Sequence, residues 1–226
     1  MSLNPHQPRP LTRDPENLRD TRLFIVACDD TYAPKQYFDF FRFTRVQVHV
    51  VETPDGRCAA SDVLERLLAF REEAEEDDEL WMLLDTDHYA QGAHLGSFKA
   101  ALQRARDCGV NVALSKPSFE LWLLLHHVEE TGLDALPAAK DVEAALRAKL
   151  GRYNKTKLMQ ADYPQASVCD ACRRAERLDA TVAGGEIPLG NTTRVYRLWK
   201  GHRRQGASTA ASARTAGLIR VASSGM

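Results

Sequence analysis

The chain has 226 residues, 44% of them hydrophobic, which suits one α/β domain of ordinary size with a real core. Its 30 Lys and Arg residues balance 31 Asp and Glu residues, so the overall charge excludes bulk attraction to nucleic acid or to anionic membrane. There is no apolar run of the roughly 18 residues that a membrane span needs, and the polar, proline-containing start lacks the apolar core of a signal peptide.

Apolar segments alternate with segments of helical period through the first half of the chain. Strands are expected at 23–27, 46–51, 80–84 and 110–114, and helices from Pro34 onward, after an N-cap at Ser61, and at 95–106. The acidic stretch 72–79 is expected to close the second helix. This order predicts an α/β fold with a mostly parallel sheet of about four strands and helices on both faces.

The pattern becomes helical after Pro117. A helix that is apolar on most sides is expected at 119–128, followed by helices near 141–150, 166–180 and 193–203. These helices form a C-terminal helical extension. The predicted organisation is a flexible arm (1–20), an α/β core (21–130), a helical extension packed on the core (131–204) and a disordered tail (205–226), because the two ends contain little apolar sequence to bury.

Two acidic pairs follow expected strands. Asp85 and Asp87 end the third strand, and because residues two apart on a strand share a face, one divalent cation could bind both. Asp29 and Asp30 directly follow the first strand. In a doubly wound sheet the ends of these strands can be neighbours, which would bring four carboxylates together. The alternative is that these acids form turns, cap helices or lie in a solvated loop.

The segment after the fourth strand contains further polar candidates. Glu120 stands near the start of an apolar helix, where it either interacts with the helix dipole, joins a metal site or accepts a proton from water. Lys116 could neutralise a phosphate. For His126 and His127, at the end of the same helix, a favourable charge–dipole interaction is expected rather than metal ligation.

Basic residues are interleaved with aromatic residues in two later segments. Tyr153 and Lys155 lie in one of them, and Arg194 begins the other. Such combinations suit phosphate contacts with base stacking, and they equally suit amphipathic helices with solvated basic faces. A glycine-rich phosphate loop is absent from the sequence, so ATP hydrolysis by this chain is not expected.

The five cysteines have no regular spacing, which favours reduced thiols and a cytoplasmic protein. Cys169 and Cys172 form a lone CxxC pair without two further ligands nearby, so a zinc site is not expected there.

With these residues in view, the chain resembles the RloB-like family of prokaryotic defence and abortive-infection loci over about residues 10–203. The resemblance rests on the strand ending in Asp85-Thr86-Asp87 and on residues 115–126, which are similar to the family's Ser-Asn-Pro-x-Phe-Glu-x-Trp-Leu-Leu-Leu-His. Two later pairs, Tyr153 with Lys155 and Asn191 with Thr193, match a Tyr-x-Lys and an Asn-Pro-x-Thr of the family.

The family is similar to the Toprim domain of topoisomerases, primases and nucleases, in which an acid after the first strand and a DxD after the third hold Mg²⁺. The resemblance therefore implies a Toprim-like sheet, Asp85 and Asp87 as ligands of Mg²⁺ or Mn²⁺, and Asp29 or Asp30 as the first-strand acid. The chain departs from its relatives where Asp29 and Asp30 replace the usual Glu-Gly, and where Lys116 replaces Asn.

Two functional hypotheses follow from this resemblance. The first is a metal-dependent nuclease of an anti-phage system that cleaves DNA or RNA. Its catalytic residues would be Asp29, Asp30 and Glu120, its metal ligands Asp85 and Asp87, and its phosphate-binding residues Lys116, Tyr153, Lys155 and Arg194. The second is a non-catalytic nucleic-acid-binding or regulatory subunit that works with an AAA-type ATPase. A phosphotransferase or phosphatase acting on a small nucleotide is a third, weaker option.

Overall fold

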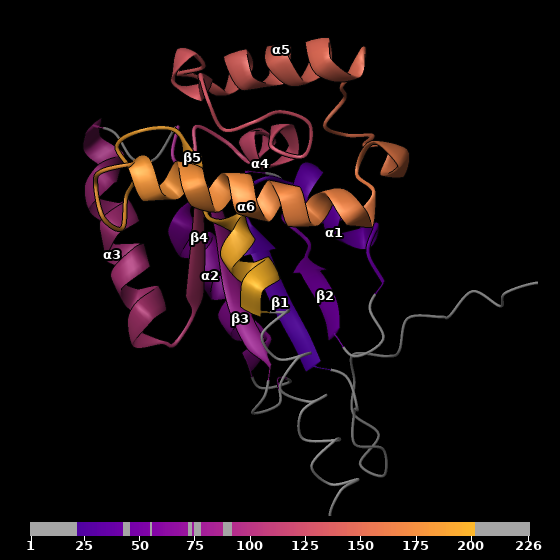
Figure 1. The fold of residues 1–226 in the computed structure, drawn as a ribbon. Helices are drawn as coiled ribbons and strands as arrows, with labels where there is room; N and C mark the ends of the chain where they lie inside the picture. Colours follow the sequence, from indigo (N-terminus) through magenta and orange to yellow (C-terminus); the bar gives the residue numbers. More distant parts are fainter. Residues whose placement is uncertain are drawn as a thin grey trace, which may run out of the picture.

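The computed structural model describes residues 22–42, 46–54, 56–71, 74, 78–87 and 92–201. Their strands form one sheet in the order β2-β1-β3-β4-β5, in which β1 to β4 are parallel and β5 is antiparallel to β4 (Figure 1). The strands are β1 (Arg22–Cys28), β2 (Val46–Val51), β3 (Glu79–Asp85), β4 (Asn111–Lys116) and β5 (Thr192–Thr193).

Helices connect the strands and continue after β4. They are α1 (Ala33–Asp39), α2 (Ala60–Ala69), α3 (Leu95–Asp107), α4 (Glu120–Leu124), α5 (Ala139–Leu150) and α6 (Gln165–Thr181). Short 3-10 turns lie at η2 (Gly92–His94), η3 (Leu133–Ala135) and η4 (Gln160–Asp162), and residues 195–201 are helical. In Figure 1, α6 crosses in front of the sheet and α5 lies above the carboxyl ends of the strands.

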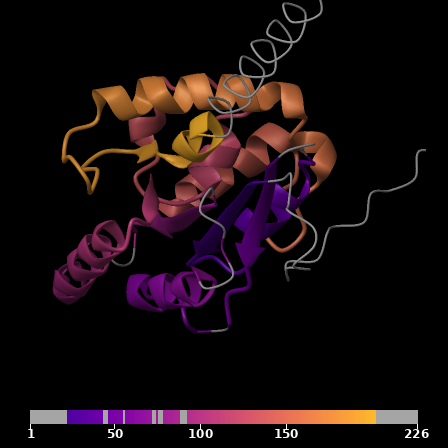
Figure 2. The same ribbon diagram turned by 90° about the horizontal axis from the view of Figure 1, so that it is seen from below.

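The central strands are apolar on both faces and separate two cores. In β1, Phe24 and Val26 contribute to one core, whereas Leu23 and Ile25 contribute to the other, as the period of two in a strand requires. Helices α2 and α3 cover the second core, and α1, α4, α5 and α6 cover the first. Figure 2 shows these two groups on opposite sides of the sheet. The predicted α/β fold with helices on both faces is therefore confirmed.

The sheet contains a fifth strand where a helix was expected to begin. Thr193 pairs with Ser115 and Thr192 with Lys116, and the hydroxyls of Ser115 and Thr193 are 2.9 Å apart. The prediction was wrong at this point because two residues are too few for a visible strand pattern. Residues 131–204 thus supply a sheet strand as well as helices.

Two helix boundaries also differ from the prediction. Helix α2 begins at Ala60 after an Ala59 N-cap, so Ser61 lies inside the helix. Helix α4 ends at Leu124, because tighter turns follow it. The expected arm at 1–20 and tail at 205–226 lie outside the described residues, as does most of the acidic stretch 72–79.

Two further findings concern the chain as a whole. In the described part of the chain no helix is long and apolar enough to cross a membrane. All five cysteines carry free thiols.

Candidate functional site

The end of β1 is bound directly to the end of β3. One carboxylate oxygen of Asp29 (Oδ2) accepts the backbone N–H of Asp85 at 2.8 Å, and the other (Oδ1) accepts the N–H of Asp30 at 2.9 Å. The predicted proximity of the two acidic pairs is thus present in the structure. Burial raises the pKa of Asp29 to about 7, although both N–H groups act to lower it.

Asp30 holds the turn that leads into α1. Its Oδ1 accepts the N–H groups of Tyr32 at 2.6 Å and Ala33 at 3.1 Å. Its Oδ2 lies 3.8 Å from Nζ of Lys155, and its side chain is only 10% exposed. Asp30 therefore combines a turn-forming role with an ion pair at the rim of the site.

Glu120 is the first residue of α4 and is 3% exposed. Its Oε1 accepts the hydroxyl of Tyr153 at 2.9 Å. Burial raises the pKa of Glu120, even though the Tyr153 hydroxyl acts in the opposite direction. A buried carboxylate with a raised pKa is favoured as a proton acceptor over a surface acid.

Asp85 lies among the other carboxylates. Burial, followed by the charges of Asp29 and Glu120, raises the pKa of Asp85 well above its ordinary value. Asp30 and Asp87 add to this repulsion. Four acidic side chains from the end of β1, the turn after β3 and the start of α4 therefore act on Asp85 at the carboxyl edge of the sheet.

Asp87 stands in the turn after β3, two residues beyond Asp85. Between them Thr86 is buried, and its Oγ1 has no hydrogen-bond partner among the residues that the structure describes. Orphaned buried hydroxyls are uncommon and are typical of sites that take up water or an ion.

The donor chemistry of this edge fits a hard divalent cation. Among the described residues, no three His, Cys, Asp or Glu side chains form a ready metal-binding group. Mg²⁺, however, keeps several waters and typically uses one or two protein carboxylates together with substrate phosphates. Asp85 and Asp87 fit that smaller requirement, and Glu120 and Asp29 supply the surrounding negative charge.

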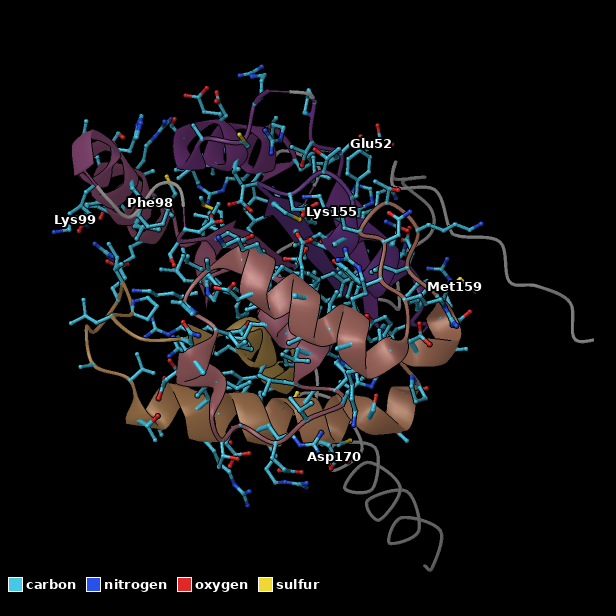
Figure 3. All side chains as sticks on the ribbon, turned by 90° about the horizontal axis from the view of Figure 1, so that it is seen from above. Glu52, Phe98, Lys99, Lys155, Met159 and Asp170 are labelled. Carbon is cyan, nitrogen blue, oxygen red and sulfur yellow. The ribbon has the colours of Figure 1, made fainter. Side chains whose placement is uncertain are left out.

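Lys155 brings a positive charge to the carboxylates. Although burial opposes it, the charges of Asp30 and Glu120 raise the pKa of Lys155. The Lys155 side chain is half-exposed, so it can reach a ligand. In Figure 3, which looks onto the carboxyl edge of the sheet, Lys155 lies toward the middle of the molecule, while Lys99 and Asp170 lie at its periphery.

The loop that carries Lys155 is held on α1 by Gln36. Its side-chain amide nitrogen donates to the carbonyl oxygen of Lys155 at 2.8 Å, and its oxygen accepts the N–H of Leu158 at 2.9 Å. No local sequence pattern indicates this role, because more than a hundred residues separate the partners. Thr53 and Arg66, which both donate to the carbonyl oxygen of Cys28 at the end of β1, were also missed, because 25 and 38 residues separate them from Cys28 and no local pattern links them.

The structure gives the other two expected phosphate-binding residues partners within the chain. Lys116 Nζ donates to the carbonyl oxygen of Leu189 at 2.7 Å. Arg194 pairs with Asp179 at 3.0 Å and donates to the carbonyl oxygen of Gly185 at 2.6 Å. Tyr153 and Lys155 are thus brought to the carboxylates, whereas Lys116 and Arg194 join segments of the fold.

His126 corrects one expectation. It is 5% exposed, and burial lowers its pKa to about 3, so it is neutral and takes part in no charge–dipole interaction. Its Nε2 lies 3.0 Å from the Tyr37 hydroxyl and its Nδ1 lies 2.7 Å from the Ser167 hydroxyl. The expectation failed because α4 ends inside an aromatic cluster rather than in solvent.

Comparison with known proteins gives one match. A model of the family described as RloB-like protein matches residues 24–200. No significant match was found among curated proteins or among solved structures. The matched span covers all of the sheet except the first two residues of β1, and all the acidic residues described above. The chain therefore belongs to the RloB-like family.

Proposed function

We propose that this protein is a divalent-metal-dependent nuclease that hydrolyses phosphodiester bonds as part of an anti-phage defence system. The observation that supports it most is the gathering of acidic side chains around Asp85 at the carboxyl edge of the sheet, where each raises the pKa of that residue. Such repulsion is relieved by a cation, and this edge is where ligands of open α/β sheets bind.

Each residue has a role in this proposal. Asp85 and Asp87 would hold Mg²⁺ or Mn²⁺, which when bound neutralises charge on the phosphate and lowers the pKa of water. Glu120 and Asp29, whose pKa values are raised, would accept the proton of the attacking water. Lys155, half-exposed beside Asp30, would attract the substrate phosphate.

The proposed biological role rests on family membership. The RloB-like family resembles proteins of defence and abortive-infection loci, and its similarity to Toprim domains favours phosphodiester chemistry. Under a Toprim-like arrangement, Asp29 would be the acid after the first strand and Asp85-Thr86-Asp87 the acidic edge after the third; this proposal is supported by the hydrogen bond between Asp29 and the backbone of Asp85.

A cleavage assay tests the proposal. The purified protein would be incubated with Mn²⁺ or Mg²⁺ and single-stranded DNA, duplex DNA or RNA. Asp85→Asn combined with Asp87→Asn should reduce cleavage by about 100-fold or more, because removing a charge-stabilising group at a reacting centre has effects of this order. Asp170→Asn, at a half-exposed acid on α6, is the matched control and should leave cleavage unchanged.

Calorimetric titration with Mg²⁺ and Mn²⁺ tests cation binding apart from turnover. Binding at millimolar concentration or tighter that is lost in Asp87→Asn supports the assignment of the ligands. Cleavage that survives unchanged in the Asp85 and Asp87 double variant would contradict it, whatever the calorimetry shows.

The second candidate is a non-catalytic nucleic-acid-binding or regulatory subunit that acts with an AAA-type ATPase. This candidate is favoured by the hydrogen bonds of Asp29 and Asp30. Both oxygens of Asp29 already accept backbone N–H groups and one oxygen of Asp30 is used in the turn, so these acids have fewer lone pairs left to accept a proton or bind a cation. Under this alternative the wild-type protein binds nucleic acid, but neither binds these cations nor cleaves. Co-purification with an ATPase subunit would then support it.

A further inference from the structure

A cavity of about 370 Å³ lies beside the carboxylates, between the end of α5 and the loop that leads to η4. Its wall combines Leu150, Leu158 and Met159 with the rings of Tyr153 and Tyr163. We propose that this cavity binds one nucleobase of a single-stranded nucleic acid. The inference deepens the proposed function and rests on it for the identity of the substrate.

The Tyr163 hydroxyl is the first observation that indicates a polar ligand. Tyr163 is 2% exposed, and within the described parts of the chain its Oη has no hydrogen-bond partner. Its ring is held by stacking on Phe40, with centroids 6.3 Å apart and an interplanar angle of 13°. A buried hydroxyl without a partner is unfavourable, and the edge of a base would supply an acceptor or donor once the cavity wall moves enough to expose the hydroxyl.

Met159 is the second observation. It is 41% exposed and is one of three large hydrophobic side chains exposed in the described residues. A thioether and an aromatic ring on one wall suit the flat apolar face of a base, which every base possesses. Small-molecule sites of this size are generally apolar with a few convergent polar groups, as here.

The charges around the cavity match a nucleic-acid backbone. Arg152 and Lys157 lie on its wall, and most of the Arg152 side chain is exposed although it pairs with Asp162 at 3.3 Å. These cations give a local basic patch on a chain of net charge −1. Local clusters of this kind bind phosphates when the protein as a whole has no bulk attraction for them.

Tyr153 connects the cavity to the carboxylates. Its ring lines the cavity, while its hydroxyl donates to Glu120 at 2.9 Å. Lys155, two residues further along the chain, lies beside Asp30. A base in the cavity would therefore bring its own backbone toward Lys155 and the acidic edge. A base in a duplex must first be unpaired and unstacked before it can enter such a cavity, which costs a few kcal/mol, so the favoured substrate class is single-stranded.

Equilibrium binding without metal tests this inference separately from cleavage. Fluorescein-labelled single-stranded 12-mers of DNA and RNA would be titrated with the full-length protein in EDTA, and binding followed by fluorescence anisotropy. The single strand should bind at least about 10-fold more tightly than the duplex of the same sequence, because the duplex must spend energy to unpair and unstack a base before inserting it.

Two substitutions locate the binding at the cavity. Met159→Ala should weaken binding by about 5-fold or more, and Tyr163→Phe by about 2- to 10-fold, which are the ranges for loss of one stacking contact and one hydrogen bond. The matched control is Leu189→Ala, another exposed hydrophobic residue outside the cavity, which should bind as the wild type does. Circular dichroism of each variant checks that the fold is kept.

Replacing single bases of the 12-mer by abasic sites identifies the inserted base. Weaker binding of the strands with an abasic site at one particular position supports insertion of that base. Equal affinity for every abasic strand overturns the inference. The inference is also overturned if Met159→Ala and Tyr163→Phe both bind like the wild type, if duplex and single strand bind equally, or if the wild type binds neither. A protein that binds the single strand in this way yet cleaves nothing with metal refutes the nuclease and leaves the base site standing.

Discussion

Acidification should destabilise this protein through His126. Ser167 donates its hydroxyl hydrogen to the carbonyl oxygen of Pro164 at 2.8 Å, so its oxygen must accept the hydrogen of His126 Nδ1. This assigns the proton of the neutral ring to Nδ1, and leaves Nε2 to accept the Tyr37 hydroxyl. A second proton on Nε2 would therefore force the Tyr37 hydroxyl to turn and accept it, leaving the hydroxyl hydrogen without this acceptor, and would place a charge in an aromatic cluster, near His127 and Arg174.

The size of the effect follows from the pKa of His126. Its pKa falls from 6.5 to about 3 on folding, and each pKa unit corresponds to about 1.4 kcal/mol. Above pH 6.5 His126 adds no pH dependence to the free energy of unfolding, because it is neutral in both the folded and the unfolded chain. Below pH 6.5 the unfolded chain binds a proton that the folded chain does not, so the free energy of unfolding should fall by about 1.4 kcal/mol per pH unit, or about 2 kcal/mol by pH 5.

Urea unfolding at several pH values between 7 and 5 would measure this slope, with His126→Gln as the reference. Glutamine does not titrate, and its amide oxygen can still accept the hydrogen of the Tyr37 hydroxyl. All other titrating groups are the same in both proteins, so the difference between the two slopes reports His126 alone. The wild type should lose about 2 kcal/mol more than the variant between pH 6.5 and 5. Identical slopes, or a wild type that gains stability on acidification as a helix-dipole interaction requires, would refute the reasoning.

Three further predictions concern the contacts that build the site and the C-terminal segment. Tyr153→Phe should lower the free energy of unfolding by about 1.5–3 kcal/mol, measured by urea unfolding, because it removes a hydrogen bond to the buried Glu120 carboxylate; no change would mean that water replaces the hydroxyl. Asp179→Ala should cost about 3–5 kcal/mol in the same measurement, since it leaves the nearly buried Arg194 without its ion pair, and a loss below 1 kcal/mol would contradict this. Gln36→Ala should speed amide hydrogen exchange in the loop that carries Tyr153 by about 10-fold while exchange in the sheet stays the same, because only the clamp on the loop is lost; equal exchange in both proteins would show that the clamp does not hold the loop.

The sequence alone determined the alternation of strands and helices in the first half of the chain. Strands such as β3 are apolar on both faces, and acidic residues follow immediately at their carboxyl ends, which are local patterns that a reader of the sequence can find. The sequence also predicted that Asp29 lies near Asp85, because parallel strands in one sheet end at the same edge.

Only the tertiary structure decided what each polar residue contacts. In other settings a histidine at a helix end titrates, but burial keeps His126 neutral. An arginine in a basic segment can bind phosphate elsewhere, but here Arg194 forms an ion pair with Asp179. Helix-terminal position and basic composition are properties of a segment, whereas burial and pairing depend on residues far away in the chain. The sequence therefore determined where the acidic edge of the sheet lies, and the packing of α1, α4 and the loop with Tyr153 decided which side chains share it.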